Sequence, residues 1–357
     1  MKRNMKSVIA IYLMFTLSSS AFAQTNRLLQ APMLLNDKAE EIKVALIGDT
    51  EAGTNFGTVL KMIAAEKANV VMINGDFGYG DSPTTWKNRV LASVDPDTLP
   101  IIGTLGNHDV GNNTNIYISI LNSFRTAKNG LLTSCTGKSG ISEGHDITAV
   151  DEVCTFGNVS IIGSGIGQVL SKTYLENRLE VKLKNVPADN WKLVGYHFTL
   201  ASMNPGIKGD ESSQKFFDII RQNGAIGAQG HTHVAMASCP IISTFKKGSP
   251  IQCHPSFTNP EERFVTPGTG MYVDSSLGGK EARTRQRCKN PTDVGCRHMV
   301  DIISGEGYTR TDGVRKTNFN RFGAMFFVFN VGGDASKAFA YFKSIDGQII
   351  FKFDLVR

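Results

Sequence analysis

Short apolar runs alternate with amphipathic segments through the first two thirds of the chain. Six of the runs predict strands that are buried on both faces: residues 42–48, 68–75, 99–106, 159–164, 192–197 and 225–230. Four segments between them have helical spacing: 56–68, 84–94, 172–186 and 212–223. Strands that alternate with helices predict an α/β layered fold with a mainly parallel central sheet.

The last third of the chain has a different pattern. Apolar and polar residues alternate over 323–331, 337–345 and 348–356, and the three segments are joined by glycine-containing turns. This alternation predicts an antiparallel meander that forms a second sheet packed on the first. The stretch 280–318 is rich in Arg, Lys, Gly, Asn and Thr, and we expect it to be a basic loop insertion.

The N-terminus has the pattern of a secretory signal peptide. Basic residues at positions 2, 3 and 6 precede the short apolar run 7–17, and Ala21-Phe22-Ala23 fits a cleavage site. An uncleaved membrane anchor is the alternative, but the run is shorter than the roughly 20 residues that a spanning helix needs. We expect cleavage after Ala23, an N-terminal extension over 24–41, and a single domain over 42–357 without a membrane span.

Charge and cysteine content agree with an exported protein. Without residues 1–23, which carry three basic and no acidic residues, the net charge falls from +6 to +3, so composition does not indicate a nucleic-acid partner. The even number of six cysteines favours disulfides in an exported chain. We expect three local bridges, 135–154, 239–253 and 288–296. The predicted location is therefore secreted or periplasmic.

Metal-binding residue types follow five of the predicted strands. The carboxyl ends of strands in open α/β sheets form binding sites, so these side chains should converge. Each residue alone has an ordinary structural explanation as a cap, a turn or a buried histidine, but the set does not. The residues are Asp49, Asp76, Asn107, His108, Asp109, His197, His231 and His233.

This set of side chains indicates two metal ions. Carboxylate, amide and imidazole ligands without cysteine suit Mn, Fe, Zn or similar ions. Two such ions, held about 3.5–4 Å apart by a bridging carboxylate, clamp a phosphoryl group and generate hydroxide for in-line attack.

The motif series GD, GD, GNHD, H and GHTH resembles the calcineurin-like metallophosphoesterase superfamily, and in particular its purple acid phosphatase branch. The resemblance covers roughly residues 42–355 and implies a four-layer α/β/β/α sandwich. It also implies that Asp76 bridges both ions, that Asp49 and His233 bind one ion, and that Asn107, His197 and His231 bind the other. His108 would be the general acid, and Asp109 would either orient it or cap a turn.

Position 51 departs from the Asp-x-His motif of many two-metal phosphoesterases, because it is Glu51. Tyr79, three residues after Asp76, resembles the tyrosine ligand of purple acid phosphatases; its alternative is an aromatic loop residue. Tyrosinate favours Fe(III) at the Asp49/Tyr79/His233 site, with Fe, Zn or Mn as the second ion. Glu51 is then a solvated loop residue, a pocket acid or an atypical ligand.

The leading hypothesis is an exported binuclear phosphatase that hydrolyses a small phosphorylated substrate by a metal-bound hydroxide. A phosphodiesterase or nucleotidase with the same metal pair is the alternative, and a secreted binding protein without turnover is a third possibility. The basic residues of 280–316 either steer anionic substrates or belong to a solvated loop. The remaining histidines, His145, His254 and His298, match no motif.

Overall fold

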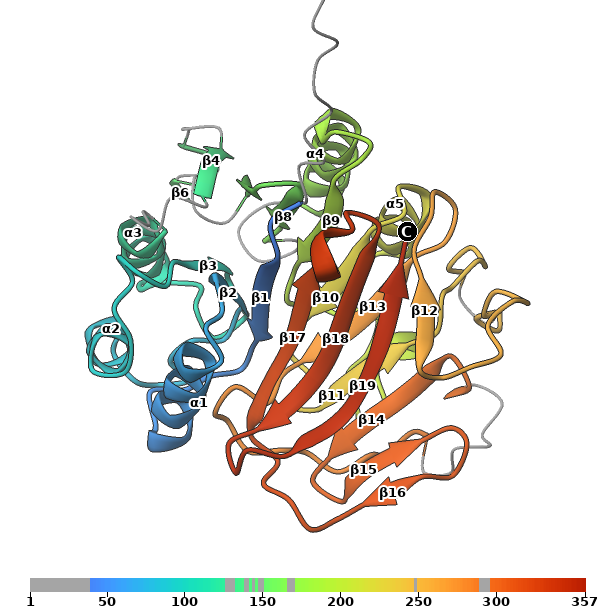
Figure 1. Ribbon diagram of the computed structural model, residues 1–357. Helices are drawn as coiled ribbons and strands as arrows, with labels where there is room; N and C mark the ends of the chain where they lie inside the picture. The colour runs from blue at the N-terminus through green and yellow to red at the C-terminus, as the bar shows by residue number, and fades with distance from the viewer. Residues whose placement is uncertain are drawn as a thin grey trace, which may run out of the picture. The chain divides into compact units, whose positions relative to one another are not determined.

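The computed structural model contains two large β-sheets with helices on their outer sides (Figure 1). It describes residues 39–125, 132–137, 141–142, 145–146, 151–165, 171–246, 249–288 and 296–357. The predicted signal peptide and the start of the predicted N-terminal extension lie outside these ranges. All described elements belong to the unit that begins at Lys38.

The first sheet combines the first three predicted strands with the C-terminal meander. Its seven strands, in spatial order, are β12 (Glu262–Phe264), β19 (Ile349–Val356), β18 (Lys337–Ser344), β17 (Gly323–Phe329), β1 (Ile42–Ile47), β2 (Val70–Asn74) and β3 (Ile101–Thr104). β1, β2 and β3 are parallel, whereas β17 pairs with β1 in antiparallel fashion.

The second sheet holds the other three predicted parallel strands. Its ten strands, in spatial order, are β16 (Arg315–Lys316), β15 (Gly307–Arg310), β14 (Met299–Ser304), β11 (Ala235–Ser238), β13 (Met271–Ser275), β10 (Ile226–Gln229), β9 (Trp191–Gly195), β8 (Val159–Gly163), β7 (Glu152–Phe156) and β4 (Leu132–Gly137). Two short strands, β5 (Ile141–Ser142) and β6 (His145–Asp146), pair with each other.

Two expectations about the sheets are wrong. The parallel strands do not form one central sheet but are divided between two mixed sheets, and the meander extends the first sheet through the β1–β17 pair. The segment 280–318 is not a loop throughout, because it contains β14, β15 and β16. The periodicity of a strand determines which face is buried, but it does not identify the neighbouring strand.

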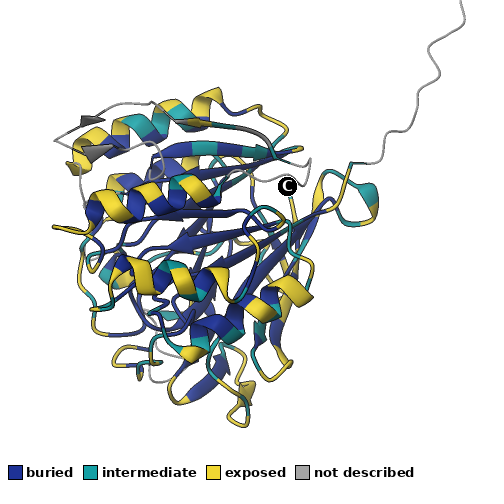
Figure 2. Ribbon diagram, turned by 90° about the vertical axis from the view of Figure 1, so that its left-hand side faces the viewer, coloured by how far each residue is buried: buried dark blue, intermediate teal, exposed yellow. Residues whose placement is uncertain are grey.

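Helices cover the outer face of each sheet, which gives the expected α/β/β/α layers. α1 (Thr54–Ala65), α2 (Pro83–Leu91) and α3 (Thr114–Phe124) lie beside the first sheet, and α4 (Lys172–Asn185) and α5 (Gln214–Gln222) beside the second (Figure 1). Short 3-10 turns occupy Ala201–Met203 and Val331–Gly333. Four helices match the predicted segments, and α3 is additional. Figure 2 shows that the helices are buried on one side and exposed on the other.

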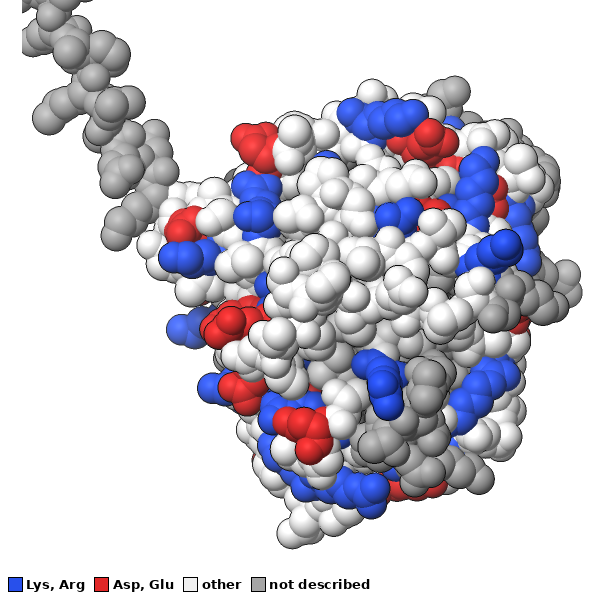
Figure 3. Space-filling model, turned by 90° about the vertical axis from the view of Figure 1, so that its right-hand side faces the viewer, with Lys and Arg blue, Asp and Glu red and all other residues white. Residues whose placement is uncertain are grey.

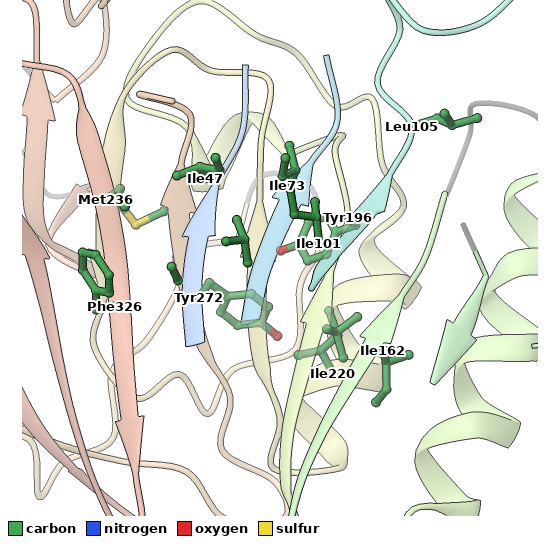
Figure 4. Packing of buried hydrophobic residues seen from close by; sticks show 14 of the residues in the cluster. Ile47, Ile73, Ile101, Leu105, Ile162, Tyr196, Ile220, Met236, Tyr272 and Phe326 are labelled. Atoms are coloured by element: carbon green, nitrogen blue, oxygen red, sulfur yellow. The ribbon is translucent and has the colours of Figure 1, made fainter. Parts of the chain in front are cut away.

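Alternate residues of the central strands pack into two different hydrophobic layers. Val44 and Leu46 of β1 belong to the core between the sheets, whereas Ala45 and Ile47 belong to the core beneath the helices. Figure 4 shows Ile47 with its counterparts Ile73 and Ile101 on the neighbouring strands. Because both faces of β1 are covered, the strand is apolar from Val44 to Ile47, and Lys43 near its start is only partly buried.

One disulfide joins the paired strands β4 and β7, and two others join residues that lie outside the named strands. The pairs are Cys135–Cys154, Cys239–Cys253 and Cys288–Cys296, which confirms the expected local pairing. Within the described ranges, no helix has the length and apolar content required to cross a bilayer.

Candidate metal centre

Three predicted ligands of the first ion form a tight group at the end of β1. The Tyr79 hydroxyl lies 2.5 Å from Oδ1 of Asp49 and 2.9 Å from Nε2 of His233. The third side of this triangle, between His233 Nε2 and Asp49 Oδ1, is 3.4 Å. The structure therefore places the Tyr79 phenol where the sequence predicted it, beside Asp49 and His233.

The predicted ligands of the second ion form an adjacent group. Nε2 of His197 lies 3.3 Å from Oδ1 of Asp76 and 3.2 Å from Oδ1 of Asn107. Asp76, His197 and His231 each offer a ligand atom within 4.8 Å of the other two. Asp76 also acts on the first group, because burial and the charges of Asp49 and Asp76 together raise the pKa of Tyr79. This position between the groups is the one that a bridging carboxylate requires.

The electrostatics of the two groups fit bound cations. Asp49 and Asp76 are 0% and 1% exposed, and among the described residues neither carboxylate forms an ion pair with Lys or Arg. Burial lowers the pKa of His197, but the charge and hydrogen bond of Asp76, with the charge of Asp49 and the carbonyl of Asn74, together outweigh this effect and raise it to about 9. Buried carboxylates need such compensation. Oxygen and nitrogen donors without thiols suit Mn, Fe or Zn, and a bound cation would favour the ionised form of Tyr79.

The backbone at these ligands adopts an uncommon conformation. Nine non-glycine residues of the described chain have positive φ, and six of them lie in the site loops: Asp49, Glu51, Asp76, Tyr79, His231 and His233. Each such residue costs on the order of 1–3 kcal/mol and persists only where the surroundings hold it. Backbone hydrogen bonds from Asp49 to Gly75 (3.0 Å) and from Thr50 to Asp76 (2.9 Å) hold the first two loops together. The ligand loops are therefore locked by the fold itself.

Two of the histidines are oriented by backbone carbonyl groups. Nδ1 of His197 lies 2.7 Å from the carbonyl oxygen of Asn74, and Nδ1 of His233 lies 3.0 Å from that of Glu281. A carbonyl at this distance accepts a hydrogen bond from Nδ1–H and leaves Nε2 for a metal ion. In both residues, Nε2 is the nitrogen that faces the carboxylates.

His108 lies on the open side of the two groups. Its side chain is exposed, and its ring packs against Tyr79 with centroids 4.5 Å apart and planes inclined by 36°. Its backbone N–H donates to Oδ1 of Asp76 at 2.9 Å. The imidazole is therefore beside the ligands without belonging to either group, as a proton donor to a bound substrate would need to be.

Asp109 does not orient His108, and we correct that expectation in favour of its alternative, the turn cap. Its fully buried carboxylate accepts hydrogen bonds from the backbone N–H groups of Gly106 (2.7 Å), Asp76 (2.8 Å) and Phe77 (2.8 Å). Burial and the charge of Asp76 raise the pKa of Asp109 to about 8, although these N–H groups oppose the shift. Asp109 thus holds the loops after β2 and β3 together.

Glu51 lies outside both ligand groups. Its carboxylate is 3.1 Å from Nζ of Lys280, and its side chain is 37% exposed. Lys280 in turn places Nζ 5.1 Å from the centroid of the Tyr79 ring. Of the three alternatives for Glu51, this contact argues against the atypical ligand and leaves a partly exposed acid that pairs with Lys280.

Sequence reasoning missed three charged residues at the rim of the site. Oε2 of Glu211 contacts Nε2 of His231. Burial lowers the pKa of Lys208 while the charge of Glu211 raises it, and the charge of Arg283 lowers it further. Arg283 is also attached to the site by its backbone N–H, which donates to the carbonyl oxygen of His233 at 2.9 Å. No motif spacing marked these residues, because they come from two loops that meet only in the fold.

Part of the charge in the basic segment is neutralised by nearby acidic residues. Arg285 pairs with Glu306 at 2.9 Å, and Arg310 pairs with Asp312 at 2.7 Å. On the face drawn in Figure 3, acidic side chains lie among the Lys and Arg, around a wide uncharged area. This distribution of charge favours a solvated region over a surface that steers anionic substrates.

The comparisons with known proteins agree with this geometry. The profile of the calcineurin-like phosphoesterase family matches residues 42–235, which is more than half of the chain, so the chain belongs to this family. The purple acid phosphatase PPD1 from yellow lupin (Lupinus luteus) seeds has a similar fold, with a TM-score of 0.60 at 13% identity over 90% of this chain. PhoD has a TM-score of 0.50 at 12% identity over 85% of this chain.

This chain spans only part of both solved structures, 55% of the lupin protein and 66% of PhoD. At these identities the likeness shows the fold alone. No curated protein matches the sequence. The family's fold implies a binuclear metal site, and the group of Asp76, His197 and His231 is a candidate for part of it.

Glycines allow the ligand loops to approach one another closely. A Cβ atom on Gly106 would lie 2.0 Å from Oδ1 of Asp76 and 2.3 Å from its backbone N. A Cβ on Gly230 would lie 2.2 Å from the carbonyl oxygen of Asn74. Real Cβ contacts are essentially never this short, so only glycine fits at either position.

We expect Gly106→Ala to displace the Asp76 carboxylate and, because Asp76 is the proposed bridging ligand, to weaken binding of both ions by at least the roughly tenfold typical of a disturbed ligand environment. Metal content of folded, reconstituted protein measured by mass spectrometry would test this. Gly209→Ala is the matched control, because its added Cβ meets nothing within 4 Å. Equal metal content in Gly106→Ala and wild type would contradict the argument.

Proposed function

We propose that the protein is an exported, metal-dependent phosphatase that hydrolyses small phosphate monoesters. The observation that carries the proposal is the pair of adjacent ligand groups with Asp76 between them and an exposed imidazole, His108, beside them. Bound ions would polarise the phosphoryl group and activate the attacking water. The three disulfides support export, because such bonds persist in oxidising compartments.

We assign the residues around the reacting phosphate to metal binding and to proton donation. Asp49, Tyr79 and His233 would hold one ion, Asn107, His197 and His231 would hold the other, and Asp76 would contribute to both. His108 donates a proton to the leaving-group oxygen or stabilises the charge that develops on the phosphoryl group. Its contact with Tyr79 fixes the ring near the first ion's ligands.

Charge at the rim supports a monoester substrate over a diester. Arg283 lies near enough to His233 for its charge to act on that imidazole: burial lowers the pKa of His233, Asp49 opposes this, and Arg283 adds to it. Lys208 acts similarly on His231, whose pKa is lowered mainly by burial. A monoester dianion gains more from these two cations than a diester monoanion does.

The Tyr79 phenol supports Fe(III) in the first position. A phenol 2.5 Å from Asp49 and 2.9 Å from His233 completes a set of hard oxygen donors with one imidazole. Tyrosinate is an electron-rich ligand that matches ferric iron, whereas the second group, with two imidazoles and an amide oxygen, suits Fe, Zn or Mn.

The substrate preference is tested with p-nitrophenyl phosphate and its bis ester. We expect a higher kcat/KM for the monoester, and we expect Arg283→Gln to reduce this preference by weakening the binding of the dianion. Arg315→Gln is the control, because that residue is exposed on β16. A marked preference for the bis ester would instead support the phosphodiesterase or nucleotidase alternative.

The iron assignment is tested with Tyr79→Phe. Native protein that holds Fe(III) at this site should show a visible phenolate-to-iron band, and the substitution should abolish it because it removes the phenol oxygen. Metal analysis of both proteins completes the test. Active native protein that is colourless and free of iron would refute the assignment and would indicate Mn or Zn.

The role of His108 is tested with His108→Ala. Loss of a general acid should lower kcat by a factor on the order of 10²–10⁴. Metal content should stay at the wild-type level, because the imidazole belongs to neither ligand group. An unchanged rate would contradict the general-acid role of His108. If the wild-type protein also shows no turnover, the result would favour a secreted binding protein.

A further inference from the structure

Glu211 is held at the rim of the candidate metal centre by its own loop. The loop follows β9, and the backbone N–H groups of Glu211 and Ser212 both donate to the carbonyl oxygen of Thr199, at 3.1 and 3.0 Å. Earlier in the same loop, the carbonyl oxygen of Lys208 accepts a hydrogen bond from Nη1 of Arg287 at 2.7 Å. The backbone that carries the Glu211 carboxylate is therefore fixed by the fold.

The contact between Glu211 and His231 joins two buried polar atoms. His231 is 3% exposed, and its Nε2 lies against Oε2 of Glu211. Neither atom has another hydrogen-bonding partner within the described part of the chain. An unsatisfied buried donor or acceptor costs about 1–3 kcal/mol, so each of these atoms depends on the other.

His197 and His233 show how an acceptor at one ring nitrogen orients the other nitrogen. Each has one ring nitrogen against a carbonyl oxygen, and the opposite nitrogen faces the carboxylates. In His231 the oxygen belongs to Glu211 instead of a backbone carbonyl. Glu211 is not part of the converging group that Asp76, His197 and His231 form among the described residues. It thus lies outside the ligands, where an orienting acceptor belongs.

We propose that Glu211 is a positioning residue for His231. Its carboxylate accepts a hydrogen bond from Nε2–H and so fixes the tautomer in which Nδ1 is free to bind the second ion. The proposal rests on the proposed function only in that His231 is a metal ligand. Outer partners of this kind typically contribute about 10–100-fold to metal affinity.

Metal titration of the full-length apoprotein tests the proposal without an activity assay. Binding of Co²⁺ is followed by calorimetry and by its visible absorption, in wild type, Glu211→Ala, Glu211→Gln and Asp210→Asn. We expect Glu211→Ala to lower the affinity for one of the two Co²⁺ ions by about 10–100-fold and to leave the affinity for the other unchanged. Glu211→Gln should retain most of the affinity, because its carboxamide oxygen still accepts the hydrogen bond.

Asp210→Asn controls for the loss of an acidic residue from the same loop. Its oxygen accepts from the backbone N–H of Ala201 at 2.9 Å, and asparagine preserves that bond, so its affinities should equal those of wild type. Unchanged affinities in Glu211→Ala would overturn the role of Glu211 alone. If Glu211→Gln binds metal as weakly as Glu211→Ala, the carboxylate binds the ion directly. That result would also overturn the positioning role of Glu211. Wild type that binds no metal would overturn both proposals.

Discussion

The close approach of three glycine-containing loops is the constraint on which the rest of the structure depends. Gly106 lies against Asp76 within the first sheet, and Gly230 brings the end of β10 in the second sheet against Asn74 at the end of β2 in the first. No side chain fits between these backbones. The carboxyl ends of strands from the two sheets therefore meet directly, and side chains that follow these strands reach one site.

This arrangement concentrates negative charge that the protein only partly neutralises. Asp49 and Asp76 are buried, and their neighbours are imidazoles, a phenol and backbone N–H groups. The fold can hold them because backbone hydrogen bonds fix the positive-φ residues that present them. Ions that bind only the folded state would add to its stability, so metal binding and folding are coupled at this seam.

The sequence was informative where local pattern determines structure. Apolar runs located β1, β2, β3, β8, β9 and β10, and the polar residues after them located the ligand groups, because a strand end directs its next side chain to the sheet edge. It was not informative about strand order, which depends on pairing between distant segments, as for β1 and β17. Asp109 was misinterpreted for a similar reason, since its partners include Asp76 and Phe77, which are far away in the sequence.

Glu51 illustrates how a departure from a family motif is compensated in space. The residue that could have been a histidine ligand instead holds Lys280, which is 229 positions away along the chain. Lys280, which also pairs with Glu281 at 3.3 Å, places its ammonium group 5.1 Å from the centre of the Tyr79 ring, within cation–π distance. Through this ion pair, position 51 contacts the ring of the tyrosine that is proposed to replace a histidine ligand there. Position 51, Lys280 and Tyr79 are best understood as one unit.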